Sequence, residues 1–313
     1  MKFRSEIKIP PFPSPIDYSS KIFGLGSCFV DNIKQKLDFY RFQNQINPFG
    51  VIFNPYSINN ILKRIIHQNN FRSQELFFHE NLWKSFQLHS SFNQTDKEEY
   101  LKEINNKLEL AGSFLKTSDW VFITLGTAWV YKLIKTDEIV SNCHKVPQKE
   151  FQKHLLSPTE ISANLIEIIE QIKTFNPQTK ILFSISPVRH LKDGFVENTQ
   201  SKSHLHVALQ PLIDKKNTFY FPSYEILMDD LRDYRFYKKD FVHPNELAIE
   251  YIWEKFQDSM ISSKVVEDMK SIEKIQKQLG HRPFTKEKPI LSIKVKEKIL
   301  KIQEKYPHIN FGL

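Results

Sequence analysis

The sequence has no run of about 18 consecutive apolar residues, the length that a membrane-spanning helix needs. Its first residues, Met1 to Glu6, turn polar at once and lack the apolar stretch of a secretory signal peptide. Two cysteines, Cys28 and Cys143, are too few for a disulfide framework, and neither HExxH nor a Cys/His zinc spacing occurs. We therefore expect a protein of the reducing cytoplasm that has no membrane segment, no metal and no organic cofactor.

Positive charge is in excess, but it is unevenly distributed. The formal net charge is +8, and residues 264–313 contain twelve Lys and Arg against six Asp and Glu, a net of +6. A solvated lysine-rich face accounts for such a segment, and the alternative is a surface that binds phosphate groups or an acidic polymer. Because the rest of the chain is near neutral, we do not expect a nucleic-acid-binding protein.

Apolar runs alternate with helical patterns along most of the chain, which is typical of a parallel sheet covered by helices on both faces. The pattern predicts strands at residues 21–25, 120–125, 180–185 and 218–221. It predicts helices over about 29–37, 96–114, 158–174 and 203–213, and from residue 244 onward. The expected fold is therefore α/β, a three-layer α/β/α sandwich with a mostly parallel sheet.

The length of 313 residues allows one large domain with an appendage. We expect residues 1–261 to form the sheet domain. Within it, the aromatic and His-rich segment 44–91 is expected to be a long insertion near the site. Residues 262–313 are expected to form a basic, mainly helical C-terminal extension, with its helix broken near Pro283 and Pro289.

In open α/β sheets, ligands bind beyond the carboxyl ends of the strands. Each predicted strand here is followed by polar residues that can do chemistry. These stretches are Gly26-Ser27-Cys28-Phe29, Gly126-Thr127-Ala128-Trp129, Ser186-Pro187-Val188-Arg189-His190 and Asp240-Phe241-Val242-His243.

Ser27 is expected where the first strand turns into a helix, and there the first-turn N–H groups are unpaired and the helix dipole is positive. A serine that attacks a carbonyl creates an oxyanion, which the N–H of Cys28 could receive. The alternative is that Ser27 only caps the helix. Cys28 could itself be the nucleophile, although a small packed residue is the commoner role for cysteine. Cys143 and His144 could form a pair of nucleophile and base. They are adjacent, however, and adjacent side chains in an extended segment point apart, so we do not expect this pair.

Asp240 and His243 form the only Asp-x-x-His in the chain. A carboxylate three residues before a histidine can bind Nδ1 and leave Nε2 free to take a proton from serine. The alternative is a histidine before a helix-starting proline, with a surface aspartate nearby. Arg189 and His190 could bind an anionic or hydroxyl-rich substrate. Alternatively, Arg189 pairs with one of the acids in residues 229–233.

A family resemblance rests on several stretches of the chain. Gly26-Ser27-Cys28-Phe29-Val30 resembles the signature of GSCFA-domain proteins, with valine as the final residue. The similarity continues through residues 47–50, 77–80, 124–129, 142–147, 186–194 and 229–244, and it spans about residues 20–256.

The GSCFA family is similar to the SGNH, or GDSL-like, hydrolases, and this implies a flavodoxin-like fold. It also implies that Ser27 is the nucleophile, His243 the general base and Asp240 the residue that orients it. Gly50 would be an oxyanion-hole glycine. The SGNH Gly-x-Asn-Asp block reads Gly126-Thr127-Ala128-Trp129 here, so its asparagine is missing, and Thr127 could donate through its hydroxyl or backbone. Asn142 or Asn47 could otherwise supply an amide, and the aspartate usual before the serine is here Gly26.

The expected reaction is hydrolysis of a small-molecule or carbohydrate ester through an acyl-enzyme, and the acyl group is expected to be small, such as acetyl. The residues expected to contact the substrate are Asn47, Gly126, Trp129, His144, Arg189 and His190. An O-acyltransferase with the same triad and a binding module on a degenerate hydrolase fold are the alternatives.

Overall fold

The computed structural model of the chain describes residues 4–279 and 293–312. At its centre lies a five-stranded sheet with the order β10-β9-β5-β1-β2, in which every neighbouring pair is parallel. The strands are β1 (Lys21–Gly26), β2 (Gln43–Ile46), β5 (Trp120–Leu125), β9 (Lys180–Ile185) and β10 (Thr218–Tyr220). Numbered within this sheet, the order is 2-1-3-4-5, the flavodoxin-like arrangement. The predicted α/β/α fold with a flavodoxin-like sheet is confirmed.

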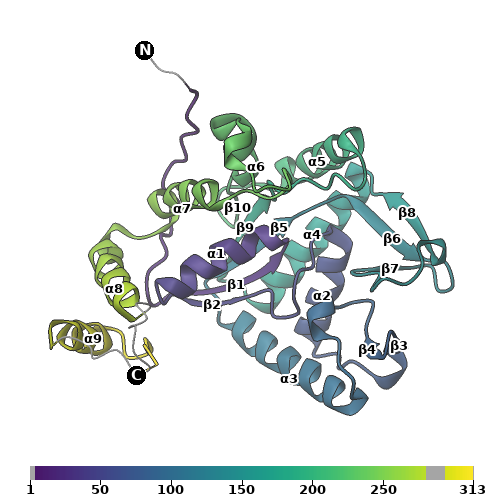
Figure 1. Cartoon of the computed structure of the whole chain (residues 1–313), viewed down its shortest axis with the longest axis horizontal. Coiled ribbons are helices and arrows are strands. Elements are labelled where there is room, and N and C mark those ends of the chain that lie inside the picture. The colour runs from purple at the N-terminus through teal and green to yellow at the C-terminus, as the bar shows by residue number, and fades with distance from the viewer. Residues whose placement is uncertain (1–3, 280–292, 313) are drawn as a thin grey trace.

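Helices cover both faces of this sheet (Figure 1). One face packs against α1 (Cys28–Phe39) and α7 (Glu246–Met260). The other packs against α2 (Pro55–His67), α3 (Lys97–Lys116), α4 (Pro158–Phe175) and α5 (Phe195–Leu209). Successive strand residues supply the two faces in turn, so Phe122 packs with α1 and α7 while Ile123 packs with the four-helix side. This double burial explains why the predicted strands read as continuous apolar runs.

Two small antiparallel sheets lie outside the central one. The connection from β5 to α4 forms β6 (Trp129–Leu133), β7 (Glu138–Val140) and β8 (Phe151–Leu155), in the order β7-β6-β8. Strands β3 (Phe77–His79) and β4 (Leu82–Lys84) form a hairpin. The short helix α6 (Ser223–Glu225) runs into a π-helical turn at Ile226–Leu231.

The segment 44–91 differs from the expected insertion, because much of it belongs to the three layers. Its first residues lie in β2, which pairs with β1, and α2 covers the sheet. Helix α5 begins at Phe195, earlier than the predicted start at residue 203. Its first turn exposes Phe195 and Val196, so it lacks the apolar periodicity that marks the rest of the helix.

The C-terminal extension is helical as predicted, with α8 (Val266–Leu279) and α9 (Ile293–Lys305). Figure 1 shows these helices at the end of the molecule opposite to β6, β7 and β8. Their side chains Ile272 and Ile302 are buried in the same apolar cluster as α1 and α7, so the extension packs on the domain. Pro283 and Pro289, where a helix break was predicted, lie outside the described residues.

Candidate active site

A cavity of about 680 Å³ opens at the carboxyl edge of the central sheet. The loops that follow β1, β5 and β9 all contribute to its lining, as does the loop before α7. Its lining residues include Cys28, Thr127, Trp129, Arg189, Asp240 and His243. The polar residues that the sequence places after separate strands are therefore brought to one cavity, at the edge where open α/β sheets bind ligands.

Ser27 lies directly between β1 and α1 and is the N-cap residue of α1. Its Oγ accepts a hydrogen bond of 3.2 Å from the N–H of Phe29, and its own N–H donates to the carbonyl of Thr124 at 3.0 Å. The side chain is buried, with 2% of the residue exposed, and the neighbouring Cys28 rather than Ser27 lines the cavity. The serine thus sits at the predicted turn, with its hydroxyl engaged as a helix cap.

The turn before Ser27 has no room for a side chain. A Cβ on Gly26 would lie 2.4 Å from the carbonyl oxygen of Thr124, so an aspartate cannot occupy this position. The Gly26 N–H donates to Asn47 Oδ1 at 2.9 Å, and Asn47 Nδ2 donates to Asp31 at 2.8 Å. The Asn47 side chain, predicted to contact substrate or the oxyanion, instead holds the turn that carries Ser27.

Asp240 and His243 form the pair that their spacing predicts. Asp240 Oδ2 lies 2.8 Å from His243 Nδ1, and Oδ1 accepts the N–H groups of His243 at 3.0 Å and Val242 at 2.9 Å. The backbone N–H of His243, that of Val242 and the imidazole, in that order, hold the pKa of Asp240 well below its usual range. The ionised carboxylate favours the tautomer with the proton on Nδ1, so Nε2 is a proton acceptor.

No hydrogen bond joins His243 Nε2 to Ser27 Oγ among the described contacts. The two residues reach the cavity region from different loops, and His243 is partly exposed, with 42% of its side chain accessible. A productive triad requires the Ser27 hydroxyl to donate to His243 Nε2, and the capping bond leaves this proton available because the hydroxyl acts there only as an acceptor.

Both cysteines line the cavity, but their environment disfavours thiolate. Burial first, and the nearby Asp31 charge second, raise the pKa of the Cys28 thiol. Burial raises the pKa of Cys143 to about 11. Because the thiolate is the nucleophilic form, these shifts favour the serine over either cysteine.

Two of the predicted oxyanion donors do not belong to the cavity lining. The Gly50 N–H donates to the carbonyl of Asn47 at 2.9 Å in a tight turn, where Gly50 has a φ of +74°. Asn142 Oδ1 accepts the N–H of His144 at 2.8 Å, and neither Gly50 nor Asn142 lines the cavity. Their oxyanion roles stay predictions that these contacts do not support.

Thr127 does line the cavity, but its hydroxyl is turned to α5. The Oγ1 atom lies 2.9 Å from Ser201 Oγ and accepts the N–H of Trp129 at 3.1 Å. The backbone N–H groups of Thr127 and Cys28 make no hydrogen bond among the described residues. These two N–H groups are the available backbone donors from the loops after β5 and β1.

Lys202 was not among the residues selected from the sequence. It is fully buried on α5, and its Nζ donates to the carbonyls of Gly126 and Ser186, each at 2.7 Å. Burial lowers the pKa of Lys202 to about 7. A signal was present in the sequence, because Lys202 falls three residues before Leu205 and seven before Leu209 on the buried stripe of the helix.

Of the predicted substrate contacts, Arg189, His190 and Trp129 line the cavity. Arg189 lies over the rings of Tyr237 and Tyr234, at 4.5 and 5.7 Å, and has no described carboxylate partner. The three aspartates within residues 229–233 each pair with another arginine. The ion pair considered for Arg189 therefore does not form.

His190 is half-buried, and its ring stacks on Phe53 at a centroid distance of 5.3 Å. Burial, then the charges of Lys202 and His243, lower its pKa to about 3, so the imidazole is neutral at physiological pH. Its Nε2 is buried and has no hydrogen-bond partner in the described structure. The neutral ring therefore lines the cavity with a nitrogen that is unpartnered but closed to solvent.

Trp129 and His144 have different surroundings. The Trp129 indole donates to the carbonyl of Glu197 at 3.2 Å and carries the Lys153 ammonium 4.3 Å from its ring centre. His144 is buried against Phe77 and lies with Nε2 2.7 Å from the carbonyl of Ser85. It does not line the cavity, so its predicted contact with substrate is not supported by its position.

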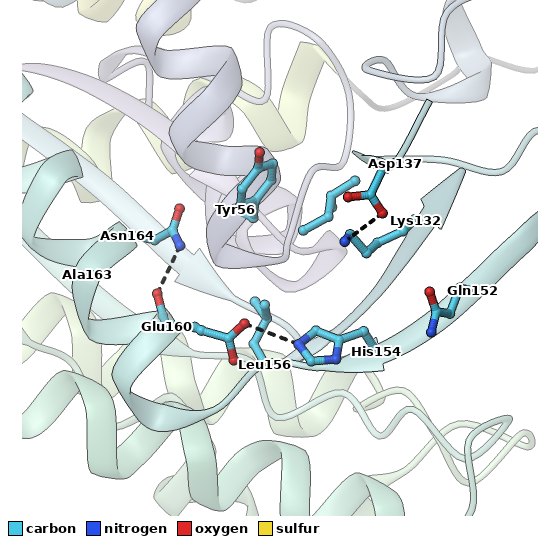
Figure 2. Close-up of a pocket in the computed structure, with 10 residues that line it drawn as sticks. Tyr56, Lys132, Asp137, Gln152, His154, Leu156, Glu160, Ala163 and Asn164 are labelled. Carbon is cyan, nitrogen blue, oxygen red and sulfur yellow. Dashed lines mark hydrogen bonds and ion pairs between the residues drawn. The ribbon is translucent and has the colours of Figure 1, made fainter. Parts of the chain in front are cut away.

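A second cavity, of about 620 Å³, lies between the small sheet, α4 and the start of α2 (Figure 2). Figure 2 shows Lys132 turned toward Asp137 and His154 toward Glu160, at 2.8 and 3.2 Å. Its lining contains none of the residues predicted for the site and no serine or cysteine. The cavity at the carboxyl edge is therefore the candidate active site.

Two features are absent from the described residues. Over residues 4–279 and 293–312, no group of three or more His, Cys, Asp or Glu side chains could hold a metal ion. In the same ranges, no helix combines the length and apolarity needed to cross a bilayer.

Comparison with known proteins gives a family and a few distant structures. No curated protein matches this chain. A Streptococcus pneumonia protein named for platelet activating factor is similar at 12% identity, with 80% of this chain and 85% of that chain covered and a TM-score of 0.42. A carbohydrate esterase family 3 protein from Talaromyces cellulolyticus is similar at 10% identity, with 80% and 98% covered and a TM-score of 0.37. The GSCFA family matches residues 21–256, most of the chain and nearly all of the central sheet domain. The chain therefore belongs to the GSCFA family.

Proposed function

We propose that this protein is a serine hydrolase that cleaves an acyl ester of a small molecule or carbohydrate. The observation that carries the proposal is the pair of Asp240 and His243. Its hydrogen bond leaves Nε2 free at a cavity that begins beside Ser27. A buried strand–helix turn, an oriented imidazole and unpaired backbone donors are the parts that acyl transfer requires.

In the proposed first half-reaction, His243 Nε2 takes the proton of Ser27 as Oγ bonds to the ester carbonyl carbon. The carbonyl π electrons move to its oxygen, and the N–H of Cys28 donates to the resulting oxyanion. Collapse restores the carbonyl and breaks the bond to the alcohol oxygen, which takes the proton from His243. The acyl group stays on Ser27.

In the second half-reaction, water attacks the acyl-enzyme and gives its proton to His243 Nε2. Collapse releases the acid, and the proton returns to Ser27 Oγ. Asp240 stays ionised throughout and holds the ring by Nδ1, consistent with its depressed pKa. An alcohol in the place of water would make the same protein an O-acyltransferase.

The test treats the protein with a fluorophosphonate probe and with 4-nitrophenyl acetate, beside Ser27→Gly and Cys28→Ala variants. Glycine is chosen because it removes the hydroxyl while it keeps most of the N-cap preference, and alanine would cost the helix about 1 kcal/mol. We expect labelling and turnover to be lost in Ser27→Gly and kept in Cys28→Ala.

The opposite pattern, with loss in Cys28→Ala alone, would contradict the proposal in favour of a thiol enzyme. Intact protein that is neither labelled nor active above buffer would favour a binding module. Adding glycerol to the assay separates hydrolysis from transfer, since an acyltransferase would form glyceryl acetate at the expense of free acetate.

A further inference from the structure

The loop after β5 has four consecutive backbone N–H groups, and only one of them lacks a partner. The Gly126 N–H donates to the carbonyl of Phe53 at 2.7 Å, and the Ala128 N–H donates to Ser201 Oγ at 2.7 Å. The N–H of Trp129 is taken by Thr127 Oγ1. Thr127 itself is 3% exposed, and its N–H has no partner among the described residues. A buried N–H without a partner is rare, and here it belongs to a residue that lines the cavity.

The carbonyl of the same peptide group is held by Lys202. Nζ lies 2.7 Å from the Gly126 oxygen, and the Gly126–Thr127 bond is trans, as are all described peptide bonds. In a planar trans peptide, the C=O and N–H point in opposite directions. A carbonyl that points into the domain toward Lys202 therefore turns the Thr127 N–H away from it.

The second bond from Lys202 anchors the ammonium. It goes to the Ser186 carbonyl, whose peptide group contains the nitrogen of Pro187 and so has no N–H to orient. Lys202 thus connects the loop after β9 to the loop after β5. Of the two peptide groups that it contacts, only Gly126–Thr127 has an N–H, so only this group can act as a hydrogen-bond donor. No described Asp or Glu pairs with Lys202, so its charge is directed at these two carbonyls.

We propose that Lys202 is a positioning residue that orients and polarises the Gly126–Thr127 peptide, so that the Thr127 N–H joins the Cys28 N–H as an oxyanion donor. The inference rests on the proposed ester hydrolysis. It assigns the role of oxyanion donor to a backbone N–H, because the asparagine of the SGNH Gly-x-Asn-Asp block is missing from this chain. A cation on the carbonyl draws electron density from the peptide and strengthens its N–H as a donor, and low local dielectric increases the effect.

The charge of Lys202 depends on pH, so the pH dependence of kcat distinguishes the proposed role from a role in packing alone. Burial lowers its pKa to about 7, and the nearby Cys28 opposes this shift. The other titratable groups that face it are His190 after β9, His206 on α5 and Tyr224 on α6. Loss of the proton from Nζ removes the charge that polarises Gly126, so kcat should fall as the pH rises through about 7.

The experiment compares Lys202→Met and Lys202→Arg with Lys84→Met, a second buried lysine. Lys84 is 2% exposed and contacts Glu80 and the carbonyl of His144, and it does not line the candidate site. The readouts are kcat and KM for 4-nitrophenyl acetate and the inhibition constant of an aryl trifluoromethyl ketone. The Ser27 adduct of that ketone carries an oxyanion.

We expect Lys202→Met to lower kcat by about 10- to 100-fold with KM within roughly threefold, the pattern of a lost transition-state interaction. Binding of the ketone should weaken by a similar factor, and the fall in kcat above pH 7 should disappear. Lys202→Arg keeps a cationic donor, so its kcat should lie between those of the intact protein and Lys202→Met. Lys84→Met should keep the kcat of the intact protein.

A folded Lys202→Met variant with kcat and ketone affinity within threefold of the intact protein would overturn the inference. If that variant does not fold, the intact protein decides, since a kcat that stays flat from pH 6 to pH 9 contradicts the role. These outcomes differ from failure of the proposed function, which would appear as turnover that Ser27→Gly leaves unchanged.

Discussion

At the scale of single residues, the candidate site combines groups that a hydrolase needs with one that the sequence did not indicate. Asp240 and His243 were predictable because they are three residues apart and bond within one turn. Lys202 was harder to find, because its partners Gly126 and Ser186 lie 76 and 16 residues away along the chain. Contacts of that kind depend on how the strands are ordered, which short motifs do not reveal.

Arg189 gives a prediction about substrate charge. Its guanidinium lies at the cavity over two tyrosine rings and has no described acidic partner, so it can receive an anionic group. We expect the protein to prefer 4-acetoxybenzoate to 4-acetoxybenzamide, which is nearly isosteric and neutral. In Arg189→Gln the ratio of kcat/KM between these esters should fall by about 10-fold, roughly 1.4 kcal/mol.

The matched control is Arg235→Gln, because Arg235 already pairs with Asp233 at 3.0 Å. Arg235→Gln should leave the ratio of kcat/KM between the two esters within twofold of its value in the intact protein. If the intact protein showed no preference for the anionic ester, a hydroxyl-rich neutral substrate would be the better description.

Lys202 also links pH to stability. Its folded pKa of about 7 lies below the ordinary value of 10.5, so the unfolded chain binds more protons between these pH values. The stability that Lys202 contributes is therefore full above pH 10.5 and is lost as the pH falls through 7. Between pH 7 and 9 the free energy of unfolding should rise by on the order of 2–3 kcal/mol more in the intact protein than in Lys202→Met.

Urea denaturation of both proteins at the two pH values measures this difference. Equal changes in the two proteins would show that Lys202 titrates alike in the folded and unfolded states. Lys202 would then stay charged up to pH 9, and the fall in kcat expected above pH 7 would also be absent.

At the scale of elements, the strongly apolar strands and the capped helices were predictable, and the polar edge strand was not. Strand β2 is Gln43-Asn44-Gln45-Ile46, with no apolar alternation, and it pairs with β1 because the chain after α1 returns beside it. Its assignment requires the tertiary structure. Glu138–Val140 in the small sheet is similarly short, and it forms a strand only by pairing with β6.

Helix α4 allows a local prediction. Ser157 Oγ accepts the Glu160 N–H at 3.2 Å, and the Glu160 carboxylate accepts the Ser157 N–H at 2.7 Å, which makes a reciprocal capping box. Ser157→Ala should lower the free energy of unfolding by about 1 kcal/mol in urea denaturation. Ser203→Ala, on the exposed surface of α5, is the control and should change it by less than about 0.5 kcal/mol.

At the scale of the whole molecule, the family match ends at residue 256, but the buried core continues past it. Helices α8 and α9 lie in the apolar cluster that also contains α1, α7 and one face of the sheet. Composition predicted a basic helical extension there. It did not reveal the packing, because the apolar residues of α8 and α9 are a narrow stripe among many lysines.

The extension should therefore contribute to the stability of the sheet domain. Ile272 is completely buried in the shared cluster, so Ile272→Ala should lower the free energy of unfolding by about 2–4 kcal/mol. Ile166, on α4, is 42% exposed, and Ile166→Ala serves as the control with a smaller expected loss. A single denaturation transition for Ile272→Ala, shifted to lower urea, is the expected result. Two separate transitions would show that the extension unfolds on its own.

The small sheet between β5 and α4 contributes residues to both cavities. Tyr131 lines the candidate active site, and Lys132, the next residue of β6, lines the other cavity. On β8, Gln152 and His154 line that second cavity, while Lys153 between them contacts Trp129. Substitutions at the neighbouring residues Tyr131 and Lys132 therefore reach different chambers. A change at either residue would alter one chamber while the central strands β1, β5 and β9 stay as they are.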